Sequence, residues 1–253
     1  MHNRRLTGTY DCAFARCAAI AIAIAVTLSL LAMSRAAGAA DWGGMLGYSS
    51  DNILRGHSLS NGQPAWLADL HVQIDGAWVI GVGATAERPP RQSAGAQLTA
   101  TIDRRWRFGD DWVAKAGVVH YESPWNLFGD RLRYNEIAIA LGYRGRWSAT
   151  LTHSPDVTGL SERGRPLRGT GTFLESNFHQ PINGRLAADI GLGYADYAGV
   201  GQIDYAYGSA GLRYDIGHVF LYATMLWTNP SPQIYGLRAD PRQRWVASVV
   251  WSF

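Results

Sequence analysis

The feature that most constrains this chain is a repeated alternation of apolar with small or polar residues, in segments of about ten residues. In one such segment, Leu70 and Val72 share a face, and Asp69 and His71 share the opposite face. Successive side chains of a β-strand point to opposite sides of the sheet, so this period predicts strands with one apolar face. After residue 40 we find no convincing helical period and no apolar run of membrane-helix length.

Twelve segments of this kind follow one another along the chain. They span about 43–53, 65–75, 77–86, 95–107, 111–121, 134–144, 146–154, 171–180, 184–196, 205–216, 218–228 and 243–253. The connections after odd-numbered segments are long, such as "RGHSLSNGQP", whereas those after even-numbered segments are short, such as "DGA". With an even strand count, this alternation places every long loop at one end, which is the layout of an outer-membrane barrel. A sandwich with Greek-key connections is not expected to keep it.

Aromatic residues support a membrane setting for these strands. Tryptophans stand near the ends of the apolar faces, at Trp66, Trp78, Trp106, Trp112, Trp147, Trp227 and Trp245. Membrane interfaces select such rings at both edges of an apolar band. We therefore predict an all-β fold, a single antiparallel transmembrane β-barrel of 12 strands.

The start of the chain has the pattern of an export signal. Arg4 and Arg5 precede an apolar run over residues 18–33, and the Ala-rich stretch "SRAAGAADW" follows. A positive start, an apolar core and a small-residue exit predict a cleaved signal peptide, residues 1–40, with the barrel over 41–253. The run is slightly short for a membrane anchor, which takes about 20 residues.

Charge and cysteine content change once this segment is removed. Four of the 23 basic and one of the 20 acidic residues lie in residues 1–40, which leaves 19 of each. A nearly neutral chain has no general attraction for nucleic acid, so no nucleic-acid partner is expected. Cys12 and Cys17 both precede the predicted cleavage site, which leaves the exported chain without a disulfide.

The last nine residues, "WVASVVWSF", end the chain on an aromatic strand. In an even-stranded barrel this strand must pair with the first, because an open edge would expose unpaired backbone groups to lipid. A terminal Phe resembles the signature that the barrel assembly machinery recognises in bacterial outer-membrane proteins. We predict a role for Phe253 in closure and assembly.

Two stretches resemble the TorF-type porin family, once catalogued as a conserved hypothetical family. The first is "GYSSDNILRGHSLSNGQPAWLADLHV", which contains Asp51, Arg55 and Gly56, and the second is "VVHYESPWNLFGDRLRYNEIAIALGY", which contains Glu136. Leu54 departs from the family, which often has an aromatic residue before the Arg-Gly pair. The resemblance covers about the first half of the exported chain and implies a barrel without defining its solute. We interpret Arg55 and Gly56 as setting a bend and a structural contact.

Twelve strands lie between the eight of a filled barrel and the sixteen or more of a wide channel, so we expect a narrow water-filled path. Charged and polar side chains on the inner face would set its selectivity. The candidates are Asp69, His71, Asp103, Arg105, Lys115, Glu136, Arg185, Asp189, Tyr207 and Arg213, followed by Ser209 and Asp215. The competing interpretation is that these residues only pair with one another inside a plugged barrel.

The expected function is passive diffusion of small hydrophilic solutes through an outer-membrane porin of a Gram-negative cell. The alternative is a closed barrel that acts in structure or surface interaction through its long extracellular loops. Arg163, Arg165 and Arg168 gather in the fourth long connection, where lipopolysaccharide phosphates are their expected contacts. The expected partners are therefore outer-membrane lipid, lipopolysaccharide, the assembly machinery and a small solute.

Enzymes also exist on this architecture, but their chemistry is not indicated. A lipid-facing esterase needs Ser and His on one strand face, and Leu151 and Pro155 flank His153 at two-residue spacing. Asp130 and Glu162 have no His near them in sequence for a protease-like site. No metal-ligand spacing or phosphate-binding glycine loop stands out, so we expect no enzyme activity, no metal and no cofactor.

Overall fold

The computed structural model describes residues 40–88, 95–123, 132–160, 166–198, 203–229 and 243–253. The barrel lies almost entirely in the compact unit of residues 43–253. The predicted signal peptide lies almost wholly outside the described residues, as do Arg163 and Arg165. No described helix is long and apolar enough to cross a membrane.

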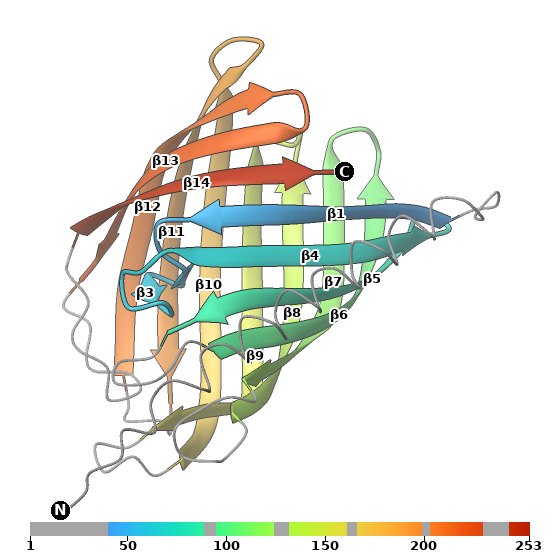
Figure 1. Ribbon diagram of the computed structural model, residues 1–253. Coiled ribbons are helices and arrows are strands. Elements are labelled where there is room, and N and C mark those ends of the chain that lie inside the picture. The colour runs from blue at the N-terminus through green and yellow to red at the C-terminus, as the bar shows by residue number, and fades with distance from the viewer. Residues whose placement is uncertain (1–39, 89–94, 124–131, 161–165, 199–202, 230–242) are drawn as a thin grey trace, which may run out of the picture. The chain divides into compact units, whose positions relative to one another are not determined.

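Twelve antiparallel strands form a closed barrel (Figure 1). They are β1 (Ala40–Ser49), β4 (Ala65–Ile74), β5 (Trp78–Glu87), β6 (Gly95–Phe108), β7 (Trp112–Ser123), β8 (Leu132–Tyr143), β9 (Trp147–Leu160), β10 (Pro166–Pro181), β11 (Leu186–Tyr197), β12 (Ile203–Ile216), β13 (Val219–Thr228) and β14 (Gln243–Ser252). Neighbours in the chain pair with one another, and β14 pairs with β1, with Leu46 opposite Trp251. The predicted 12-stranded antiparallel barrel is confirmed.

The two ends of the barrel differ in their connections. The turn end carries the short connections, such as residues 75–77 and 217–218, and the loop end carries the long ones. Asp75 and Arg144 adopt positive φ values of 51° in tight turns, each followed by a glycine. Such turns need left-handed backbone, which Gly and Asp or Asn accept most readily.

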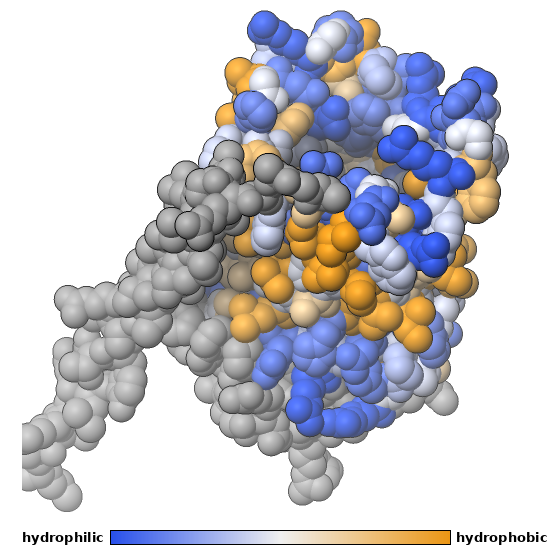
Figure 2. Space-filling view, turned by 90° about the vertical axis from the view of Figure 1, so that its right-hand side faces the viewer, coloured by the Kyte–Doolittle hydropathy of each residue, from blue (hydrophilic) through white to orange (hydrophobic). Residues whose placement is uncertain are grey.

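Burial is inverted relative to a soluble protein. Polar side chains such as Ser154 and Glu136 are enclosed together with the aromatic Phe173, whereas Ile139 and Leu192 are 60% and 59% exposed. Figure 2 shows apolar side chains gathered in a band across the middle of one face, with hydrophilic side chains above and below. An apolar outer belt around a polar interior is the pattern of strands that face lipid.

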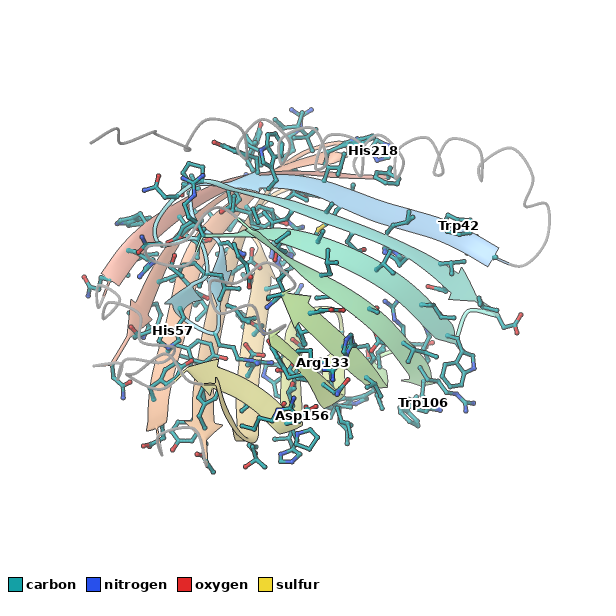
Figure 3. All side chains as sticks on the ribbon, turned by 60° about the horizontal axis from the view of Figure 1, so that its bottom comes forward. Trp42, His57, Trp106, Arg133, Asp156 and His218 are labelled. Atoms are coloured by element: carbon teal, nitrogen blue, oxygen red, sulfur yellow. The ribbon has the colours of Figure 1, made fainter. Side chains whose placement is uncertain are left out.

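The first long connection contains a small hairpin, β2 (Ile53–Leu54) and β3 (His57–Ser58), which the sequence did not predict. Ile53 pairs with Ser58, and Leu54 pairs with His57. Figures 1 and 3 place this hairpin within the ring of strands, and its contacts with β8, β10 and β12 agree. We call residues 50–64 the inward loop.

Three predicted segments have an end that lies four or more residues from the observed strand end. The first ends at Ser49 instead of residue 53, because the chain turns into the lumen there. The seventh extends to Leu160 and the eighth begins at Pro166, with a register shift between Gly169 and Gly171. Arg168 consequently lies on β10 opposite Thr158, so the prediction that it lies in the fourth long connection is wrong.

Candidate functional site in the barrel lumen

The inward loop is fixed at its base by a buried carboxylate. Asp51 accepts hydrogen bonds from Ser58 Oγ at 2.5 Å and Ser60 Oγ at 2.8 Å, both from the same loop. Arg244 on β14 donates to the other oxygen of Asp51 at 2.6 Å. A buried charge needs both a counter-charge and further hydrogen bonds, and Asp51 receives both.

The tip of the inward loop reaches the far wall of the barrel through Arg55. Its guanidinium makes two hydrogen bonds to Glu136 on β8, at 2.6 and 2.8 Å. The two side chains are only 7% and 2% exposed. Burial by itself lowers the pKa of Arg55, but the hydrogen bonds and charge of Glu136 outweigh it and raise this pKa well above its usual value.

Aromatic side chains from the wall enclose the same guanidinium. The guanidinium carbon of Arg55 lies 3.6 Å from the ring centre of Phe173 on β10. Phe173 also contacts Tyr197 on β11, and Tyr205 on β12 donates its hydroxyl to the carbonyl of Arg55 at 3.0 Å. These residues belong to a buried apolar cluster of the described chain, and Tyr207 packs against it.

Glycine lets the inward loop approach the wall closely. Gly56 follows Arg55 with φ of +79°, and a Cβ placed on it would lie 2.5 Å from Thr228 Cγ2 and 2.8 Å from Tyr207 Cβ. No larger residue fits that gap without displacing the loop or the wall. The expectation that Arg55 and Gly56 set a bend and a structural contact agrees with these distances.

The turn half of the lumen holds an open cavity. Its volume is about 480 Å³, and side chains from β8 to β13 line it. Asn177, Ser209 and Thr224 present polar groups to it, together with the ionisable residues His179, Asp189 and Arg213. A cavity of this size accommodates a small solute, since ligand pockets are about 300–1,000 Å³.

The structure brings three pairs of predicted lumen residues together. Asp69 Oδ1 lies 2.7 Å from His71 Nδ1, and Lys115 donates to Asp103 at 3.3 Å. Arg213 donates two hydrogen bonds to Asp215. All three pairs are formed by residues close in sequence or on adjacent strands.

Other predicted lumen residues pair with side chains that were not predicted to line the lumen, or form no ion pair. Asp189 lies 2.7 Å from His179, and Tyr207 donates to Glu175 at 2.7 Å. Within the described residues, Arg105 and Arg185 form no side-chain ion pair. The inner wall is therefore neither fully neutralised nor a continuous basic surface.

Several residues around the inward loop were not predicted from the sequence, among them Phe173, Glu175, Tyr197, Tyr205 and Arg244. Arg244 shares the polar face of its strand with Ser248, so its inward direction was readable. Glu175 and Phe173 lie in the segment that alternates least regularly. The contact of Phe173 with Arg55, which lies more than 100 residues earlier, has no local sequence signal.

The terminal residue completes the seam of the barrel. Phe253 donates its backbone N–H to Gly44 O at 3.1 Å, and Phe253 O accepts from Gly44 N at 3.0 Å. These two bonds extend the β1–β14 ladder by one pair beyond Met45 and Ser252. Recognition of Phe253 by an assembly machinery stays a prediction.

Metal binding finds no support in the described part of the chain, where no group of three or more His, Cys, Asp or Glu is placed to hold an ion. His153, weighed for an esterase, contacts Thr172 Oγ1 at 3.1 Å on the exposed side of the wall. No pair of Ser and His is formed there.

No protein-family model and no curated protein matches the chain. Among solved structures, the NanC porin shares 10% sequence identity, with 84% of this chain and 99% of that chain covered and a TM-score of 0.55. The toluene transporter TodX of Pseudomonas putida shares 10% identity over 87% of this chain and 90% of that chain, with a TM-score of 0.49. An outer membrane channel of Pseudomonas putida F1 shares 12% over 86% and 96%, with a TM-score of 0.47. The likeness to NanC establishes the fold, a closed outer-membrane type of barrel.

Proposed function

We propose that this chain is an outer-membrane channel through which small hydrophilic solutes diffuse passively. The observation that carries the proposal is the polar cavity of about 480 Å³ inside a closed barrel with an apolar outer belt. Fixed charges and hydroxyls on the inner wall replace part of a solute's hydration, which is what a narrow diffusion path requires. The resemblance in fold to the NanC porin supports the same function.

The inward loop divides this path into two parts. The loop spans the loop half of the lumen from its base at Asp51 to its tip at Arg55, which contacts Glu136, and the cavity lies in the turn half. We infer that the inward loop forms the narrowest part of the channel and that solutes pass beside it. The selectivity residues are then those of the constriction together with the ten predicted lumen residues.

A closed barrel that acts in structure or surface interaction is the second candidate. The specific observation in its favour is the anchoring of the inward loop by two buried ion pairs, Asp51–Arg244 and Arg55–Glu136. Both pairs hold the loop across the lumen. In this case the long connections would carry the function, with lipopolysaccharide among their partners.

Single-channel conductance of the refolded protein in a planar bilayer tests the proposal. Discrete current steps with ion preference in a salt gradient are expected for the intact chain. A variant that replaces residues 52–62 with a short Gly-Ser linker should conduct more. Current from neither protein, with both correctly inserted, would overturn the channel and leave the structural barrel.

The remaining parts of the proposal concern export and family. We propose that residues 1–40 are a signal peptide, that Phe253 is read by the barrel assembly machinery, and that the chain is a TorF-type porin of a Gram-negative cell. Asp51, Arg55, Gly56 and Glu136, which carry the family resemblance, meet at the inward loop. Cleavage mapping of the exported protein would test the first of these points.

A further inference from the structure

The site occupied by Arg55 has the composition of a binding site for a cation. Glu136 supplies a carboxylate at two hydrogen-bond distances, 2.6 and 2.8 Å, and Phe173 supplies a ring face at 3.6 Å. A planar guanidinium matches a carboxylate through two parallel N–H bonds and stacks on an aromatic face. We call Glu136, Phe173, Glu175, Tyr197, Tyr205 and Tyr207 the wall cage.

The wall cage carries more negative charge than Arg55 neutralises. Arg55 binds Glu136, whereas Glu175 accepts a hydrogen bond from the hydroxyl of Tyr207 at 2.7 Å and forms no ion pair within the described part of the chain. The same wall therefore carries a second carboxylate, that of Glu175, next to the Tyr207 that packs against the aromatic cluster. The cage attracts a further or a competing cation, because charge interactions strengthen as water is excluded.

Arg55 is an imperfect occupant of the cage. Its Nε–H is buried and has no hydrogen-bond acceptor in the described chain. Its backbone has φ of +49°, a left-handed conformation that is unfavourable for a residue with a side chain. A free guanidinium compound carries neither the backbone strain nor the tether, so it is able to compete for the same carboxylate and ring.

We propose that the wall cage is a recognition site for small guanidinium-bearing solutes, which displace Arg55 and release the tip of the inward loop. The inference deepens the proposed channel function, on which it rests for its biological meaning. The Arg55 side chain then occupies the site in place of the solute. The constriction opens when a compound with a guanidinium group displaces that side chain. Displacement does not disturb the base of the loop, which Asp51 and Arg244 hold separately.

Binding of methylguanidinium to the refolded full chain in detergent, measured by calorimetric titration, tests the proposal. Arg55→Ala empties the cage and should bind methylguanidinium at least tenfold more tightly than the intact protein. The double variant Arg55→Ala with Glu136→Gln lacks the charged acceptor and should lose that binding. Methylammonium has the same charge without the planar fork, and should bind Arg55→Ala at least tenfold more weakly than methylguanidinium.

Equal binding to Arg55→Ala and to the double variant would overturn the proposal, as would absence of binding to Arg55→Ala. If Arg55→Ala does not fold, Phe173→Leu keeps the ion pair and serves instead. With the stacking ring gone, its affinity for methylguanidinium should fall below that of the intact protein, and an unchanged affinity would contradict the site.

The binding measurement is separable from the channel. Binding in detergent without any bilayer current would remove the channel function and leave the site. Current without methylguanidinium binding would remove the site and leave the channel. In the intact protein, millimolar methylguanidinium should raise bilayer conductance, while equal methylammonium chloride controls for ionic strength.

Discussion

At the scale of single residues, Gly56 decides whether the inward loop can lie against the wall. Two features of Gly56 disfavour any residue with a side chain. Its φ is +79°, and a Cβ placed on it would lie 2.5 Å from Thr228 Cγ2. Gly62, in the same loop, has a φ of +69° but nothing within 4 Å of such an atom. A comparison of substitutions at Gly56 and Gly62 therefore separates the free-energy cost of the backbone conformation from the free-energy cost of steric crowding.

Gly56→Ala should therefore destabilise the protein more than Gly62→Ala. Both variants place an Ala in a left-handed backbone conformation, which lowers the stability of each. Only Gly56→Ala also overpacks its surroundings, which typically costs about 1–3 kcal/mol of stability. The free energy of unfolding in urea measures the difference. Equal values would mean that the loop has room to move away from Tyr207 and Thr228.

Arg244 is a second residue whose substitution has a defined consequence. Arg244→Gln leaves the carboxylate of Asp51 buried without its positive partner, with only Ser58 and Ser60 to satisfy it. Loss of one member of a buried ion pair costs about 3–5 kcal/mol, and we expect a loss of unfolding free energy in that range. Limited proteolysis should also cut the inward loop faster in this variant.

Arg144→Gln provides the control for this experiment. Arg144 also makes a double hydrogen bond to a carboxylate, that of Asp111, but both side chains are exposed to solvent. Exposed ion pairs contribute little to stability. A comparable loss in both variants would show that burial of Asp51 is not the cause.

At the scale of elements, the barrel strands were predictable because their signal is local. A period of two assigns each side chain to the lipid or the lumen, and turn glycines such as Gly76 and Gly145 mark the ends. The inward loop was not predictable, since its contacts join Arg55 to Glu136 over 81 residues and Asp51 to Arg244 over 193. The same limit explains why Glu136 was recognised as a lumen residue while its partner was not.

Cross-strand contacts between glycines and aromatic rings stabilise neighbouring elements. Gly208 on β12 lies opposite Trp227 on β13, and a Cβ on Gly208 would lie 2.2 Å from the indole. Gly142 on β8 is different, since the nearest atoms to such a Cβ are at 3.7 Å. One glycine is covered by a ring, and the other has space beside it.

Gly208→Ala should reduce the free energy of unfolding by about 1–3 kcal/mol, because the indole must leave its position. Gly142→Ala should instead raise it by about 0.4–1 kcal/mol, because an Ala that fits lowers the entropy of the unfolded chain. Urea unfolding of both variants checks the signs. A stabilised Gly208→Ala would show that Trp227 repacks without cost.

At the scale of the whole molecule, the balance of fixed charge along the lumen sets ion preference. In the turn half, Asp103 offsets Lys115 and Asp215 offsets Arg213. Arg105 lies opposite Lys115 in the β6–β7 register and has no ion-pair partner among the described side chains. Its charge, like that of Arg185, therefore has no local compensation among the described side chains.

Arg105→Gln should accordingly shift the reversal potential in a salt gradient toward cation preference. Arg213→Gln is the matched comparison, because it also removes one positive charge. This substitution breaks the two hydrogen bonds to Asp215 as well, so the electrostatic field in the lumen changes in a less simple way. Screening lengths are about 10 Å at 0.1 M salt and about 3 Å at 1 M, so the shift from Arg105→Gln should shrink strongly at the higher concentration. A reversal potential unaffected by Arg105→Gln at both salt concentrations would place the selective charges elsewhere, at the constriction formed by the inward loop and Glu136.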